Sequence, residues 1–217
     1  HLLKHNKGKG VMIGHMDDMD PRVVTVIGAG VAGTQSILKA IDNKALVKVV
    51  DSSQSKLDDL KSKYGTENVE YILASKDSIQ VSVNESDLVI GSVYVVGKEA
   101  PKVVTKDMLS SMNPGTVMVD VSIDQGECFE TSKPTTHAEP TFIVEGVVHY
   151  CVANMPGGVP RTSTIALNNA TLPFLIKLAN DGYNKTLKND YNFLAGLNIH
   201  KGQVTHKAVA DAFGYTY

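Results

Sequence analysis

The stretch VVTVIGAGVAGTQS at residues 23–36 decides the fold of this chain. It joins a run of β-branched residues, as in a buried strand, to the glycines Gly28, Gly30 and Gly33, and then to a helix-like segment. A Gly-x-Gly-x-x-Gly turn in this context is the fingerprint of a dinucleotide-binding site. The first glycine permits the tight bend, the second lets the backbone approach a pyrophosphate, and the third brings helix and strand together. The alternative is a glycine-rich corner that binds nothing.

An acidic residue at the end of the next predicted strand favours the dinucleotide interpretation. Asp51 ends the run ALVKVVD and stands 18 residues after Gly33, close to the roughly 20 at which a carboxylate binds the adenosine ribose. A carboxylate there repels the 2′-phosphate of NADP, so the sequence predicts NAD. The alternative role for Asp51 is to cap the following helix.

Short apolar runs alternate with helix-like segments between residues 23 and 152. The helix-like segments show apolar residues at spacings of three and four, as at Ile37 and Ile41 and again at Leu57 and Leu60. The alternation predicts an α/β fold, a Rossmann-type doubly wound parallel sheet. The predicted strands are residues 23–27, 47–50, 88–90, 116–121 and 147–152.

The character of the sequence changes after GGVPRTS at residues 157–163. We expect Thr162 or Ser163 to cap a long apolar helix, and Pro173 to bend or break it. The last thirty or so residues read as a small helical or hairpin tail. We therefore expect a connector at residues 1–20, an NAD-binding domain at 21–160 and, at 161–217, a helical tail that belongs to a second domain.

Composition narrows the classes of partner. The 21 basic and 23 acidic residues give a net charge of −2, so no basic surplus is present to neutralise a nucleic acid. No apolar run approaches the roughly 20 residues that span a bilayer, and we expect no membrane segment. Cys128 and Cys151 make no disulfide framework, which favours a reducing, cytoplasmic location.

A burst of polar residues follows the predicted strand at 116–121, in the stretch VMVDVSIDQGECFE. Ligands of open α/β sheets bind beyond the carboxyl ends of the strands, which would bring Asp124 near the reacting end of a cofactor. Asp124 is equally well read as a loop aspartate that caps a turn. The loop GKEAPKVVT at 97–105 likewise either lies over the cofactor or is simple surface.

Other residues invite chemical interpretations that we do not favour. His149 and Cys151 lie two apart on a predicted strand, as in a metal pair or a Cys–His nucleophile, but a buried histidine and an inert thiol are the more common arrangement. The histidines and aspartates of the first 20 residues match no established ligand spacing. We expect no metal.

Two long motifs, DQGECFETSKPTTHAEPTF at 124–142 and HYCVANMPGGVPRTSTIALNNATLP at 149–173, identify a family. The chain resembles the NAD-dependent L-alanine dehydrogenases, of the alanine dehydrogenase/pyridine nucleotide transhydrogenase alpha family, from end to end. The resemblance implies a cytoplasmic hexameric oxidoreductase of L-alanine catabolism, which reversibly converts L-alanine to pyruvate and ammonium while reducing NAD. The sequence departs from the family pattern in the acidic stretch GHMDDMDP, at Glu127 where a glycine is common, and at Lys133 where some members have arginine.

The resemblance also implies roles for individual residues. Asp124 would act near the nicotinamide, where it orients water and stabilises a cationic imine, while the other substrate-binding groups belong to an N-terminal half that this chain lacks. The implied cofactor contacts are Gly28, Gly30, Val31, Ala32, Gly33, Asp51, Lys56, Val93, Tyr94, Val121, Ser122, Ile123, Asp124, Lys133, Val152, Ala153, Asn154 and Met155. The alternatives are the nucleotide-binding part of a nicotinamide nucleotide transhydrogenase and a stand-alone NAD-binding module.

Overall fold

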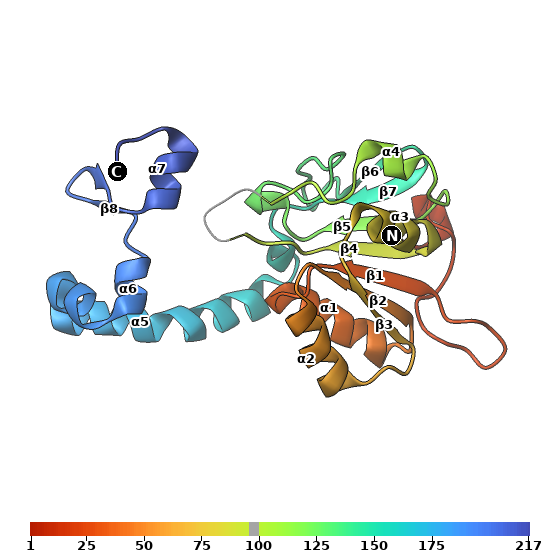
Figure 1. Ribbon diagram of the computed structural model, residues 1–217, viewed down its shortest axis with the longest axis horizontal. Helices are drawn as coiled ribbons and strands as arrows, with labels where there is room; N and C mark the ends of the chain where they lie inside the picture. The colour runs from red at the N-terminus through yellow and green to blue at the C-terminus, as the bar shows by residue number, and fades with distance from the viewer. Residues whose placement is uncertain (96–99) are drawn as a thin grey trace. The chain divides into compact units, whose positions relative to one another are not determined.

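The structure, a computed structural model, describes residues 1–95 and 100–217. The chain forms two compact units (Figure 1). The first contains His1–Val95 and residues 100–155, and the second is Pro156–Tyr217. Residues 97–99 of the loop expected at 97–105 lie outside the described residues.

A seven-stranded sheet forms the centre of the first unit, in the order β3-β2-β1-β4-β5-β7-β6. Each pair of neighbours is parallel except β6 and β7. The strand order reverses between β1 and β4, which is where open α/β sheets bind ligands. The predicted Rossmann-type fold is confirmed. The strands are β1 (Val23–Ile27), β2 (Leu46–Asp51), β3 (Val69–Leu73), β4 (Leu88–Gly91), β5 (Val117–Asp120), β6 (Thr141–Val144) and β7 (Val147–Tyr150).

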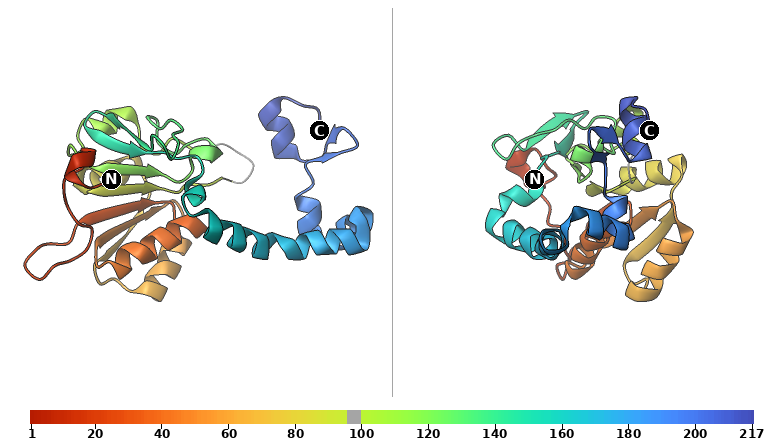
Figure 2. Two further views of the ribbon diagram at one scale, coloured as in Figure 1. Left: turned by 180° about the vertical axis from the view of Figure 1, so that it is seen from behind. Right: turned by 90° about the vertical axis from the view of Figure 1, so that its left-hand side faces the viewer.

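Helices cover both faces of this sheet. Ile37 of α1 and Leu57 of α2 pack with one face of β1 and β2, while Val83 of α3 and Leu109 of α4 pack on the other face. Figure 2 shows the same arrangement from behind and from the side. The helices are α1 (Val31–Asp42), α2 (Gln54–Tyr64), α3 (Lys76–Glu85) and α4 (Lys106–Leu109), with 3-10 turns η1 (Lys4–Asn6), η2 (Ile123–Gln125) and η3 (Met155–Gly158).

The strands that the sequence prediction missed are the two edge strands. β3 and β6 each have a neighbour on one side, and most of their residues are partly or fully exposed. Such strands lack the continuous hydrophobicity that marks a strand buried on both faces. The expected strand at 147–152 ends as β7 at Tyr150, and Val152 then makes an isolated bridge to Thr135.

The second unit is a helical and hairpin tail, as expected. The cap of its long helix was predicted wrongly. The residue before the helix is Val159, and the Ser163 hydroxyl donates to the carbonyls of Pro156 and Val159 instead of capping the helix. The helix continues through Pro173, so of the expected bend or break the break does not occur there; the non-helical residue is Gly182, with φ 71°. The elements are α5 (Pro160–Asn189), α6 (Tyr191–Ala195), β8 (Ile199–His200), β9 (Gln203–Val204) and α7 (Lys207–Phe213).

Several large apolar side chains of α5 are exposed to solvent. Leu167, Phe174 and Leu175 are each more than half exposed. Within residues 1–95 and 100–217, no helix combines the length and the apolar character that crossing a membrane requires.

Candidate functional site

The three glycines of the turn after β1 are required for three different reasons. Gly28 has φ +97°, and a Cβ there would lie 2.7 Å from the Ser92 carbonyl oxygen. A Cβ on Gly33 would lie 1.8 Å from the Gly28 carbonyl oxygen, so the helix passes too close to the turn for any side chain. At Gly30, in contrast, an added Cβ would have no atom of the described residues within 4 Å apart from those of Gly30 and its chain neighbours. The second glycine thus leaves open the space through which a phosphate reaches the backbone.

The first turn of α1 offers backbone donors to that space. The N-cap of this 12-residue helix is Gly30, which has no side chain to accept from the first-turn N–H groups, and no acidic residue stands in that turn. First-turn N–H groups have no partner within their own helix, and the helix dipole makes this end positive. The arrangement is suited to binding an anion such as a pyrophosphate.

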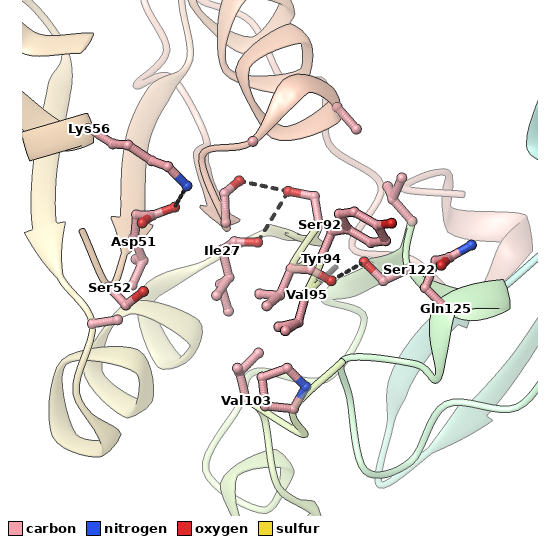
Figure 3. Close-up of a pocket in the computed structure, with 18 of the residues that line it drawn as sticks. Ile27, Asp51, Ser52, Lys56, Ser92, Tyr94, Val95, Val103, Ser122 and Gln125 are labelled. Atoms are coloured by element: carbon pink, nitrogen blue, oxygen red, sulfur yellow. Dashed lines mark hydrogen bonds and ion pairs between the residues drawn. The ribbon is translucent and has the colours of Figure 1, made fainter. Parts of the chain in front are cut away.

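A cleft of about 630 Å³ opens at the carboxyl ends of β1, β2, β4 and β5 (Figure 3). It lies at the reversal of strand order, where the fold predicts a ligand site. The cleft brings together more than half of the site residues that the sequence singled out. These are Gly28, Gly30, Val31, Ala32, Asp51, Lys56, Val93, Tyr94, Val121 and Ser122.

Asp51 lies at the end of β2 and joins the cleft to the glycine turn. Its side chain is 8% exposed; Oδ2 accepts from the Ala29 N–H at 2.7 Å and Oδ1 from the Ser53 N–H at 2.8 Å. The cap of α2 is Ser53, whose hydroxyl accepts from the Lys56 N–H. Each carboxylate oxygen keeps a lone pair, so Asp51 can still accept from a ligand hydroxyl. The Lys56 ammonium lies 3.9 Å from Oδ2 (Figure 3).

The remaining residues singled out by the sequence lie outside the cleft lining. Ile123 is buried, and Asp124 is exposed in η2 beside Gln125, which lines the cleft. Lys133 is exposed, with its ammonium 4.5 Å from the centre of the Phe142 ring. The residues not in the lining are Gly33, Ile123, Asp124, Lys133, Val152, Ala153, Asn154 and Met155.

Several lining residues were not found from the sequence. Ser92 and Ser52 directly follow β4 and β2. Like Asp51, they are polar residues at the carboxyl ends of strands, where open α/β sheets bind ligands. Pro101 and Val103 come from the described part of the loop expected at 97–105, which therefore borders the cleft. The other residues found only in the structure are Ile27, Val50, Ala74, Ile79, Val95 and Gln125.

A buried carboxylate organises the loop after β5. Asp120 is 0% exposed. Its Oδ1 accepts from the Ser122 N–H at 3.0 Å and faces the Cys128 thiol at 3.3 Å. Its Oδ2 accepts from the Cys128 N–H at 3.0 Å, the Phe129 N–H at 3.4 Å and the Ser132 hydroxyl at 2.6 Å. The loop therefore closes around Asp120, with Asp124 and Gln125 near its middle.

His149 and Cys151 are a buried histidine and a buried thiol, as the sequence favoured. Because the Val147 carbonyl can only accept, His149 Nδ1 carries the proton and donates to it at 3.0 Å, and Nε2 accepts from the Thr131 hydroxyl at 2.8 Å. Burial lowers the pKa of His149 and raises the pKa of the Cys151 thiol. Among the described residues, no group of three or more His, Cys, Asp or Glu side chains is arranged to hold a metal.

Comparison with known proteins gives a consistent result over almost the whole chain. The sequence model of the family described as Alanine dehydrogenase/PNT, C-terminal domain, matches residues 1–207. Over 216 residues the chain is 52% identical to the alanine dehydrogenase of Halomonas elongata. This alignment covers 100% of the chain and 58% of the relative, so the chain spans little more than half the length of that protein.

Solved structures agree with the sequence comparison. An L-alanine dehydrogenase superposes with a TM-score of 0.88 at 41% identity, covering 98% of this chain and 58% of that one. The transhydrogenase from Sinorhizobium meliloti superposes with a TM-score of 0.70 at 23% identity, covering 90% of this chain and 54% of that one. The second likeness is one of fold alone.

Proposed function

Because this chain belongs to the alanine dehydrogenase/PNT C-terminal domain family, we propose that it is the NAD-binding part of an oxidoreductase that reversibly converts L-alanine to pyruvate and ammonium. Members of the family depend on NAD(H). The observation that carries the proposal is the 52% identity to an alanine dehydrogenase over the whole chain. The chain spans 58% of that relative, and in this proposal the complete reaction would also need the part that it does not span.

The residues around the glycine turn fit the adenosine and pyrophosphate half of NAD. The open space at Gly30 and the uncapped start of α1 support a pyrophosphate there. In this proposal Asp51 and Lys56 hold the adenosine ribose, and the Asp51 carboxylate disfavours the 2′-phosphate of NADP. The pyrophosphate residues are Gly28, Gly30, Val31, Ala32 and Gly33.

The nicotinamide half would lie toward the ends of β4, β5 and β7. These strands are neighbours in the sheet, and their carboxyl ends share one edge because they are parallel. The Ser122 hydroxyl donates to the Val93 carbonyl at 2.8 Å, which joins the segments after β4 and β5 (Figure 3). The residues proposed for this half are Val93, Tyr94, Val121, Ser122, Ile123, Asp124, Lys133, Val152, Ala153, Asn154 and Met155.

Asp124 is proposed to be the catalytic residue of this chain. When bound, the nicotinamide would supply the acceptor for the hydride that leaves the alanine Cα. The exposed Asp124 carboxylate would then stabilise positive charge on the substrate nitrogen and orient the attacking water by accepting its hydrogen bond.

The same proposal extends to the domains and the assembly. Residues 1–20 would be a connector, 21–160 the NAD-binding domain and 161–217 part of the substrate domain, in a cytoplasmic hexamer. The exposed apolar side chains of α5 support burial of that helix against other protein, and the two free, buried cysteines suit a reducing compartment. Light scattering measures the assembly, and cell fractionation measures the location.

The activity is tested by joining this chain to the part of the Halomonas relative that it does not span. The chimera should form NADH when L-alanine and NAD are supplied. Its Asp124→Asn variant should bind NADH as before but lose most of the alanine oxidation. A folded chimera that oxidises no alanine, yet passes hydride between two nucleotides, would support a transhydrogenase instead.

A further inference from the structure

The peptide group between Gly28 and Ala29 is held at both ends by side chains from the two strands beside β1. Its carbonyl oxygen accepts from the Ser92 hydroxyl at 2.7 Å, on the side of β4. Its N–H donates to Asp51 Oδ2 at 2.7 Å, on the side of β2. Figure 3 shows the Ser92 hydroxyl pointing to the end of β1 at Ile27, with Asp51 on the other side of Ile27. This peptide group is therefore fixed against rotation about the chain.

Ser92 is itself placed firmly for this contact. It directly follows β4, it is 7% exposed, and its N–H donates to the Ile27 carbonyl at 2.8 Å. The hydroxyl also lies 3.2 Å from the Ile27 carbonyl oxygen. A Cβ on Gly33 would come within 2.6 Å of the Ser92 Oγ. The hydroxyl thus fills the small space between the first and third glycines of the turn.

We propose that Ser92 is a positioning residue for the dinucleotide, which it orients through the Gly28 carbonyl without contacting the phosphates itself. This proposal rests on the proposed NAD site. With the Gly28–Ala29 peptide fixed, the next N–H groups, at Gly30 and Val31, keep their place in the lining of the cleft. Without the hydroxyl, the Gly28 carbonyl loses its side-chain donor and the turn can rotate. Binding of the phosphates must then also order the turn, which lowers the affinity.

The test compares Ser92→Ala with the wild-type chain and with Ser82→Ala as the matched control. Ser82 is also buried, but its hydroxyl donates within α3 to the Ser78 carbonyl, away from the cleft lining. Dissociation constants are measured for NADH by its fluorescence, and for ADP and adenosine by competition. ADP carries the pyrophosphate and adenosine does not, so the pair separates an effect on the glycine turn from an effect on the adenosine end.

We expect Ser92→Ala to raise the dissociation constants of NADH and ADP by the same factor, about threefold to tenfold, which is the effect of one hydrogen bond. Adenosine should bind equally to all three proteins, and Ser82→Ala should bind each ligand as the wild type does. In amide hydrogen exchange without ligand, Ala29 should exchange faster in Ser92→Ala, while Val49 in the core of β2 should not.

Three outcomes would overturn the proposal. If Ser92→Ala binds NADH within twofold of the wild type, the hydroxyl does not position the turn. If the variant binds adenosine more weakly by the same factor as ADP, or fails to fold, Ser92 stabilises the fold and does not position the dinucleotide. If the wild-type chain itself binds no NADH, the proposed NAD site fails and this proposal fails with it.

Discussion

The Asp51 carboxylate accepts a hydrogen bond of 2.7 Å from the backbone N–H of Ala29, so the end of β2 is bonded directly to the glycine turn after β1. The residue proposed to bind the ribose therefore also shapes the turn proposed to bind the pyrophosphate. The two halves of the adenosine site are coupled through one side chain.

This coupling predicts a double defect in Asp51→Asn. Both carboxylate oxygens face backbone donors, at Ala29 and Ser53, so the amide NH2 of asparagine must face one of them. We expect NADH affinity to fall about tenfold or more and the free energy of unfolding to fall by about 1–3 kcal/mol. Asp59→Asn, on the exposed face of α2, is the control in NADH and urea titrations. If Asp51→Asn and Asp59→Asn had the same NADH affinity and the same free energy of unfolding, the coupling would be refuted.

The glycine turn predicts opposite outcomes for two similar substitutions. In Gly33→Ala the new methyl would meet the Gly28 carbonyl at 1.8 Å, and because this atom is backbone we expect a loss of about 3 kcal/mol in unfolding free energy. Gly30 has φ −75° and open space around an added Cβ, so Gly30→Ala should remain within about 1 kcal/mol of wild type. Chemical denaturation measures the free energy of unfolding of both variants. A similar decrease in the two would contradict the geometry.

The loop that carries Asp124 predicts a large effect of Asp120→Asn. Each oxygen of this buried carboxylate faces at least two hydrogen-bond donors. Whichever way asparagine turns, its NH2 meets donors, and we expect a loss of about 2 kcal/mol or more in unfolding free energy. The exposed Asp58→Asn is the control. An Asp120→Asn protein as stable as this control would show that the loop does not depend on the carboxylate.

His149 predicts a pH dependence of stability. Burial lowers its pKa, against smaller opposing effects of the Val147 carbonyl and the Asp120 charge. As the pH falls below about 6.5, the unfolded chain binds a proton at this residue that the folded chain disfavours. The free energy of unfolding should therefore decrease with falling pH below this value, by at most about 1.4 kcal/mol per pH unit. His149→Asn should show a shallower slope between about pH 7 and 5.5, and an unchanged slope would exclude this histidine as its source.

The centre of the fold could be predicted because its signals are local. The strand at 23–27, the glycine triplet and Asp51 follow one another closely in the sequence, and each has the environment that its residue type requires. Edge strands β3 and β6 gave no comparable signal, since half-exposed strands need no continuous apolar run.

The parts of the site that the sequence missed depend on contacts between distant segments. Ser92 is 64 residues from the Gly28 carbonyl that it binds. Asp120 gains its hydrogen-bond donors only when the chain from Ser122 to Ser132 folds back over it. Composition cannot distinguish this aspartate from Asp124, which is four residues away and exposed.

The most direct test of the proposed NAD site is a titration of this chain and its Gly30→Ala variant with NADH and NADPH. We predict saturable NADH binding by the wild type, much weaker binding of NADPH, and loss of NADH affinity in Gly30→Ala, whose methyl enters the open space while the fold stays intact. If the wild type bound neither nucleotide, or if Gly30→Ala bound NADH as tightly as the wild type, the glycine turn would not be the NAD site.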